Sequence, residues 1–195
     1  MIKHLHLFFI IIITIGIASC HNPSTKTAGD TTPKPSAAIY TAIGYTDSIQ
    51  VKMALDTTLS YKDGMDYDSI IAVDYEGRED NLTDILDRNG DWINTIKQFK
   101  RLSPAQCKKI QSIIASSSTY DNANNYSCFV PHLGLAYFQY GEVKAHTAIC
   151  LSCMGIESTA TLGNYTKFSQ INTTAADQIA TLCEELGFSF CREKK

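Results

Sequence analysis

The sequence predicts an α+β domain: an antiparallel sheet, including a hairpin at about residues 133–152, packed with two or three helices. Strand-like and helix-like patterns occur in separate runs, which favours α+β over a wound parallel sheet. The clearest strand pattern is the alternation from Leu133 to Ser152. The clearest helix start is Ser103-Pro104, a capping residue followed by proline at the first helical position.

Two strands are expected before the hairpin. Residues 49–55 alternate apolar side chains with polar or small ones, which is typical of a half-buried strand. Residues 70–75 are β-branched and apolar and predict a second strand. The polar residues 60–68 between them, with Gly64, predict a turn.

Helical spacing predicts a first helix after Asp91, in which Trp92, Ile96 and Phe99 share one face. A second helix starts at Ser103, and the polar residues 116–127 after it predict a loop. The apolar stripe of the second helix consists of Cys107, Ile110, Ile113 and Ile114.

The last predicted helix runs from Ala175 to Leu186. Thr173 or Thr174 is its expected N-cap, and Gly187 is its expected stop. Its apolar stripe consists of Ile179, Leu182, Cys183 and Leu186.

The hairpin register depends on where its turn lies. If Gly141 and Glu142 form a two-residue turn, Phe138 faces Ala145, and Ile149 shares their mostly apolar face. That face should meet the core. The opposite face is mixed, so it should be solvated or only partly covered; it carries Leu135, Tyr137, Gln139, Lys144, His146 and Ala148.

The N-terminus has the pattern of an export signal. Lys3 precedes an apolar run from Leu7 to Ala18, which at 12 residues is shorter than the roughly 20 that span a membrane. The run ends in Ala18-Ser19-Cys20, which resembles the lipobox of bacterial lipoproteins. The resemblance implies a signal peptide over residues 1–19, cleavage before Cys20 and lipidation of its thiol. It places the protein in the bacterial cell envelope, anchored to a membrane and facing the periplasm.

Residues 20–36 lack large apolar side chains and predict a flexible tether from lipidated Cys20. Residues 37–195 then form a single globular α+β domain. The net charge of −3 argues against nucleic acid as a partner. The expected partners are the membrane, through the lipid anchor, and a protein or small molecule that the sequence does not identify.

From Trp92 onward the chain resembles an uncharacterised family of bacterial envelope proteins and lipoproteins. The resemblance rests on Cys128-Phe129-Val130-Pro131, on the hairpin with Ile149-Cys150-Leu151-Ser152-Cys153, and on residues 183–188. It implies a fold and a compartment and no activity. Arginine often follows the proline in such sequences, and here His132 takes that place.

Six cysteines remain beyond Cys20, and an exported location permits disulfides. Cys107 and Cys183 fall on apolar helix stripes and can be read as small buried residues. In the predicted register a turn at Pro131 brings Cys128 to Cys150 or Cys153. We therefore expect Cys128 to be bonded to one of these two.

Two other uses of this thiol cluster stay open. Cys150 and Cys153 have the C-x-x-C spacing of thiol–disulfide enzymes, although no helix start follows them. Cys128, His132, Cys150 and Cys153 together form a possible zinc ligand set.

Other catalytic patterns are absent from the sequence: it contains no G-x-S-x-G, phosphate-binding glycine loop or H-E-x-x-H. No cofactor is expected. The sequence therefore predicts a lipid-anchored envelope protein that binds or scaffolds a partner without catalysis. The alternative is a thiol–disulfide redox protein or a cysteine-based metal-binding protein.

Overall fold

The computed structural model describes residues 52–77, 84–87, 89–121, 129–164 and 167–192. These residues form a seven-stranded antiparallel sheet and two α-helices, which confirms the predicted α+β class. The strands are β1 (Ser69–Tyr75), β2 (Ile96–Arg101), β3 (Tyr120–Asp121), β4 (Leu133–Gln139), β5 (Glu142–Cys150), β6 (Gly155–Ser158) and β7 (Phe168–Ile171), and the helices are α2 (Pro104–Ala115) and α3 (Thr173–Leu186). The predicted signal peptide, tether and lipidated Cys20 lie outside the described residues.

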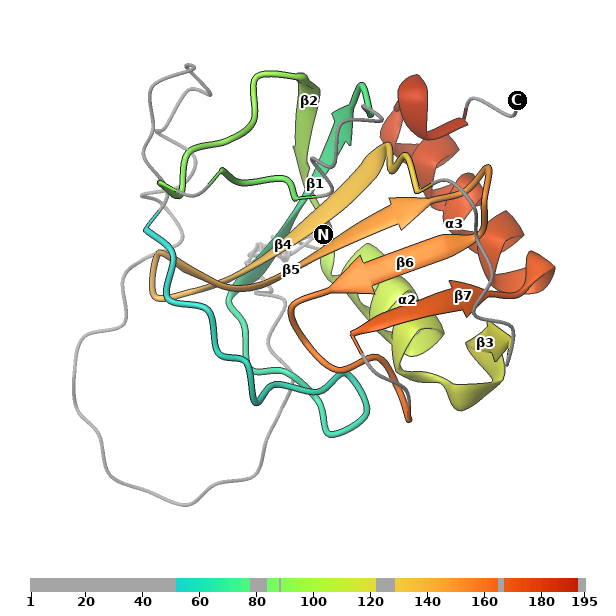
Figure 1. Cartoon of the computed structure of the whole chain (residues 1–195), viewed down its shortest axis with the longest axis horizontal. Helices are drawn as coiled ribbons and strands as arrows, with labels where there is room; N and C mark the ends of the chain where they lie inside the picture. Colours follow the sequence, from blue (N-terminus) through green and yellow to red (C-terminus); the bar gives the residue numbers. More distant parts are fainter. Residues whose placement is uncertain (1–51, 78–83, 88, 122–128, 165–166, 193–195) are drawn as a thin grey trace, which may run out of the picture.

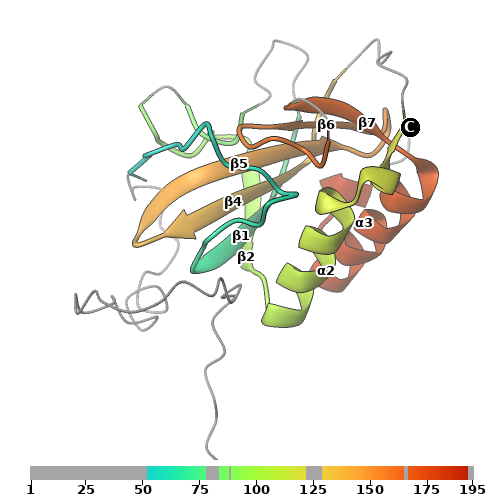
Figure 2. The ribbon, with the colours of Figure 1, turned by 90° about the horizontal axis from the view of Figure 1, so that it is seen from below.

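The sheet has the order β2-β1-β4-β5-β6-β7-β3, in which β4 to β7 form a meander of consecutive neighbours (Figure 1). Helices α2 and α3 lie side by side on one face of the sheet (Figure 2). An ion pair of 2.9 Å between Lys109 Nζ and Glu185 Oε1 joins the two helices.

Local sequence signals set both ends of the helices. Ser103 caps α2 through a capping box, in which Ser103 Oγ accepts from the Gln106 backbone and Gln106 Oε1 accepts from the Ser103 backbone. Asn172 caps α3, one residue before the first predicted cap. Gly187 ends α3 in the left-handed conformation, with φ of 70°, as predicted.

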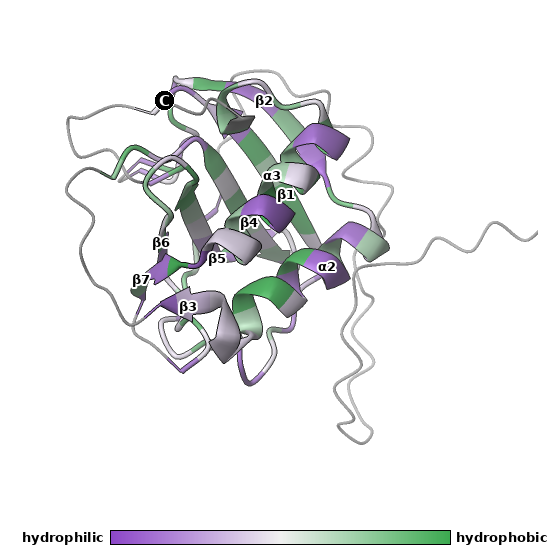
Figure 3. Ribbon diagram, turned by 90° about the vertical axis from the view of Figure 1, so that its right-hand side faces the viewer, coloured by the Kyte–Doolittle hydropathy of each residue, from purple (hydrophilic) through white to green (hydrophobic). Residues whose placement is uncertain are grey.

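Apolar side chains are buried on both faces of the sheet. Between sheet and helices, β4 and β5 contribute Leu133, Leu135 and Ile149 to the larger cluster; Figure 3 shows hydrophobic strands behind the two helices. On the opposite face a second cluster is covered by the loop residues before β2. Its buried members are Ile71, Val73, Tyr75, Ile85, Leu86, Ala136, Phe138 and Val143.

Two early predictions fail. The predicted helix after Asp91 is absent; Ile96–Arg101 is the edge strand β2, whose Phe99 pairs with Val73 of β1. Of the predicted strand at 49–55, residues 49–51 lie outside the described residues. The remainder contributes only an isolated parallel bridge, between Met53 and Val143.

The predicted hairpin exists, but its register differs by one residue. The turn is Tyr140-Gly141, with φ of 52° and 81°, and Gln139 pairs with Glu142. A bulge follows at Tyr137/Phe138. Positive φ at both turn residues matches the type I′ geometry that suits the twist of a hairpin.

In the observed register Phe138 and Ile149, which were expected to share a face, lie on opposite faces of the sheet. Tyr137 pairs with Ala145 and faces the helices, while Phe138 lies on the opposite face with Val143. Both faces are buried, so the expectation of a solvated or partly covered face is wrong. Phe138 and Ile149 are nevertheless core residues, as predicted.

Candidate functional site

The two thiols with C-x-x-C spacing lie at the turn between β5 and β6. Cys150 ends β5 and pairs with Gly155, the first residue of β6, so residues 151–154 form the turn. The backbone N–H of Met154 donates to the carbonyl of Leu151 at 3.4 Å, and the Met154 carbonyl accepts from Ile171 of β7 at 2.8 Å. The turn is therefore hydrogen-bonded to β7 as well as joined to β5 and β6, the two strands that it connects.

Cys150 and Cys153 are both free thiols. Cys150 is 1% exposed, whereas Cys153 is half-buried. The sulfur of Cys150 lies 3.3 Å from the hydroxyl oxygen of Ser152, and the sulfur of Cys153 lies 3.9 Å from the carbonyl oxygen of Cys150. Of these two cysteines, only Cys153 is accessible to solvent to a useful extent.

Hydrogen bonds to its sulfur lower the pKa of Cys150 to about 5. The largest cause is the bond from the Cys153 thiol; burial opposes it, and the Ser152 hydroxyl and the Val130 backbone add to it. The same hydrogen bond raises the pKa of Cys153 well above its ordinary value, because ionising Cys153 would break the bond that it donates, and burial raises this pKa further. The pair therefore loses its first proton more easily than an isolated thiol and retains the second.

Gly155 leaves room for the thiol site. A Cβ there would lie 2.8 Å from Cδ2 of Phe129 and 3.3 Å from the sulfur of Cys153. The Phe129 ring also packs edge-on against Phe168, with centroids 6.1 Å apart. An aromatic side chain and the half-buried sulfur thus occupy the space over this glycine.

A buried hydroxyl lies on the same side of the sheet. The phenol oxygen of Tyr75 is buried and has no hydrogen-bond partner among the described residues. Burial raises the pKa of Tyr75 well above 10, and the negative charges of Asp84, Cys150 and Glu157 raise it further. Tyr75 therefore stays a neutral phenol, and it lies near enough to Cys150 for a negative charge on that sulfur to disfavour ionisation of the phenol.

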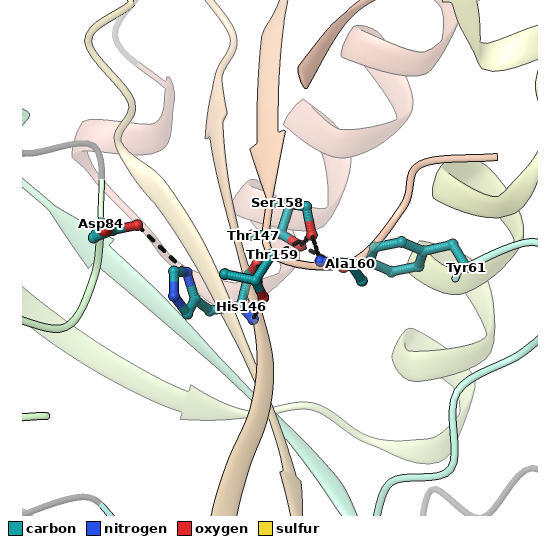
Figure 4. A network of polar contacts seen from close by, with 7 residues as sticks. All are labelled: Tyr61, Asp84, His146, Thr147, Ser158, Thr159 and Ala160. Carbon is teal, nitrogen blue, oxygen red and sulfur yellow. Dashed lines mark hydrogen bonds and ion pairs between the residues drawn. The ribbon is translucent and has the colours of Figure 1, made fainter. Parts of the chain in front are cut away.

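His146 lies further along β5. Figure 4 shows its ring directed toward Asp84, with Nδ1 3.7 Å from a carboxylate oxygen. Burial lowers the pKa of His146, and the nearby Asp84 charge opposes that shift. The imidazole is 5% exposed and its partner carboxylate is largely in water, so His146 is neutral near pH 7.

A chain of hydroxyl groups continues on the helix side of β5 (Figure 4). Thr147 contacts the hydroxyl of Tyr61 and lies 2.9 Å from Ser158 Oγ, which donates to the His146 carbonyl at 3.0 Å. The Ala160 backbone donates back to Ser158 at 3.1 Å. These groups satisfy one another inside the core and have a structural role.

The described residues overturn the predicted disulfide. Cys128 lies outside them, but Cys150 and Cys153 are both free, so neither is bonded to Cys128. The physical reason is the register: Cys150 ends β5 facing away from the helices, where Cys153 and Ser152 donate to its sulfur.

The proposed zinc ligands are not brought together by the described residues, which contain no group of three or more His, Cys, Asp or Glu suited to hold a metal. Nδ1 of His132 lies 3.1 Å from both the Gly77 nitrogen and the Tyr75 carbonyl oxygen. Its ring stacks on Phe190 with centroids 6.3 Å apart.

Sequence reasoning missed the disulfide between Cys183 and Cys191, whose Cα atoms lie 6.1 Å apart. Cys107, also read as a simple buried residue, is disulfide-bonded too. The signal for the first bridge was Gly187, because a left-handed cap turns the chain back toward the helix it ends.

Comparison of the chain with known protein families, with curated proteins and with solved structures finds no match. Among the described residues, no helix has the length and apolar character needed to cross a membrane.

Proposed function

We propose that this chain is a lipid-anchored protein of the bacterial cell envelope that exchanges disulfides through Cys150 and Cys153. One observation carries the proposal: these two cysteines are free and hydrogen-bonded to each other, whereas the other described cysteines are in disulfides. A dithiol with one easily lost proton, in a chain that otherwise forms disulfides, has the chemistry of an exchange site.

The half-buried Cys153 is the sulfur that meets the partner. As the Cys153 sulfur attacks one sulfur of the partner disulfide, its proton moves onto the Cys150 thiolate and the other partner sulfur leaves as a thiolate. Cys150 then attacks the Cys153 sulfur, forms the internal disulfide and passes its proton to the second leaving sulfur. The partner gains two electrons, and the chain loses two.

The proposal is tested by equilibrating the full chain in glutathione buffers of graded redox potential and counting free thiols by alkylation and mass spectrometry. We expect Cys150 and Cys153 to change state together, at a potential above the roughly −300 mV below which structural disulfides lie. In the Cys153→Ser variant, Cys150 should form no internal disulfide at any potential in the series. Thiols that stay free across the whole series, or a bond that glutathione never reduces, would contradict the proposal.

The envelope location rests on Ala18-Ser19-Cys20 after the apolar run. We propose residues 1–19 as the signal peptide, residues 20–36 as the tether and Cys20 as the lipidated residue. Several acyl chains would hold the protein firmly, since one chain binds only marginally. Mass spectrometry of the mature N-terminus should find an acylated cysteine, and a Cys20→Ala chain that is processed and membrane-bound as before would refute the anchor.

The expectation of a non-catalytic domain that binds or scaffolds a partner stays a prediction. A capture experiment from envelope extract with Cys150→Ser tests both ideas at once. This variant keeps the half-buried sulfur and removes the resolving one, so an exchange protein should accumulate mixed disulfides that reductant releases. A scaffold would retain the same partners with or without reductant.

A further inference from the structure

We propose that Cys150 and Cys153 together bind one Cu(I) ion through their two sulfur atoms. The proposal goes beyond disulfide exchange, because it requires two free thiols and does not require either to react with a disulfide.

Both thiols lie at the same turn, with Cys150 at the end of β5 and Cys153 within the turn. Cys150 is held by the pairing of β5 with β4 and β6, and the thiol of Cys153 donates to its sulfur. Thiolates are soft ligands that select Cu(I) over harder cations. The ion would take the place of the proton that the pair still holds at neutral pH, so that one thiolate, one thiol and Cu(I) give a bis-thiolate complex and release that proton.

The surroundings suit such a complex, which carries one net negative charge. The Ser152 hydroxyl lies 3.3 Å from the Cys150 sulfur, and backbone N–H groups of Val130 and Gly155 direct hydrogen bonds at the pair. Donors of this kind stabilise an anionic metal centre and orient its ligands. Cys150 is 1% exposed, which excludes water, and half-buried Cys153 leaves an entry path.

The same surroundings disfavour zinc. A structural zinc site takes four ligands in tetrahedral geometry, and within the described part of the chain no third suitable side chain joins the two sulfurs. Nδ1 of His132 is engaged with the backbone of Gly77 and Tyr75. A site of two soft ligands therefore favours an ion that accepts low coordination.

The test uses the full chain after mild reduction, with alkylation confirming that Cys183 and Cys191 stay bonded. Cu(I) is supplied as its coloured complex with bathocuproine disulfonate without oxygen, and Zn(II) is offered through a coloured zinc chelator. We expect the chain to withdraw one equivalent of Cu(I) and no equivalent of Zn(II).

Cys150→Ser and Cys153→Ser should each weaken Cu(I) binding by more than about 100-fold. Ser152→Ala removes a donor and keeps both sulfurs, so it should weaken Cu(I) binding less, by about 10- to 100-fold. Oxidising the wild-type pair should abolish binding, and this arm needs no substitution that could disturb folding. Wild-type chain that leaves Cu(I) on the chelator, or binding that survives oxidation, would overturn the proposal. Cu(I) binding without disulfide exchange would contradict only the proposed function.

Discussion

Cys150 lies directly across the β5–β6 pairing from Gly155, and this pairing places one free thiol, Cys150, at the start of a four-residue turn and the other, Cys153, within it. The ring of Phe129 and the sulfur of Cys153 occupy the space beside the glycine. The meander of the sheet thus creates the thiol site, and no helix N-terminus is needed to lower the pKa of Cys150. Hydrogen bonds to the sulfur have that role.

Gly155→Ala should destabilise the fold. The added methyl group would lie 2.8 Å from the Phe129 ring, so the ring and the Cys153 sulfur must move. Overpacking of this kind costs about 1–3 kcal/mol. Chemical denaturation of the reduced chain measures the loss; Ser152→Ala, in the adjoining turn and without added volume, is the control. Equal stability of the two variants would show that the Phe129 ring does not pack against Gly155.

Asp74→Asn should also destabilise the chain, through its C-terminal turn. The buried carboxylate accepts backbone hydrogen bonds from Ser189 at 2.7 Å, from Phe190 at 3.3 Å and from Cys191 at 3.0 Å. Hydrogen bonds to a charged group contribute about 1.5–3 kcal/mol, so we expect a loss of about that size. Asp177→Asn, on the exposed side of α3, is the matched control and should stay within about 0.5 kcal/mol of wild type. An Asp74 variant as stable as this control would refute the anchoring role.

Phe138→Ala should cost about 3–5 kcal/mol, because Phe138 is buried in the cluster opposite the helices. Lys144→Ala should change stability by no more than about 0.5 kcal/mol, since it removes an ion pair with Glu142 near the surface and a weaker attraction to the exposed Asp56. Thermal unfolding of the two variants checks the corrected hairpin. Greater damage from the lysine substitution would show that the faces of β4 and β5 are assigned wrongly.

Stability should fall in acid because of His146. Burial lowers its folded pKa below the unfolded value of 6.5, so the unfolded chain binds the proton first. The loss of folding stability begins as the pH falls below 6.5 and is complete once the pH is below the folded pKa of His146. The melting temperature of His146→Gln should therefore decline less than that of wild type between about pH 8 and about pH 5. Parallel declines would contradict a neutral, buried imidazole.

Much of the fold follows from local signals. The capping box at Ser103, the proline after it and the stop at Gly187 are short-range features, and the structure keeps each of them. The β-branched run that becomes β1 was equally plain. These elements were predictable because their stabilising contacts lie within a few residues of the chain.

The remainder depends on contacts that are distant in sequence. Trp92, Ile96 and Phe99 have helical spacing, yet pairing with β1 makes residues 96–101 a strand and leaves the Trp92 and Phe99 rings edge to face, 5.1 Å apart. A tyrosine at positive φ, as at Tyr140, is rare in turns, so the hairpin was placed one residue late.

The thiol site was half predictable. The C-x-x-C spacing singled out Cys150 and Cys153, but the assumed register assigned one of them to Cys128. The pKa of Cys150 depends on hydrogen bonds from Cys153, Ser152 and Val130. Those bonds depend on the turn conformation, which spacing alone does not specify.

The most direct measurement is the ultraviolet absorbance of the thiolate as a function of pH in the mildly reduced full chain. The difference between wild type and Cys150→Ala isolates the Cys150 signal. We expect one thiolate at neutral pH, lost in acid with a midpoint near the pKa of about 5. Cys153→Ala removes the main donor and should raise the midpoint toward the ordinary value near 8.5; Ser152→Ala should raise it less. Absence of a thiolate at neutral pH, or a midpoint that Cys153→Ala leaves unchanged, would contradict the account.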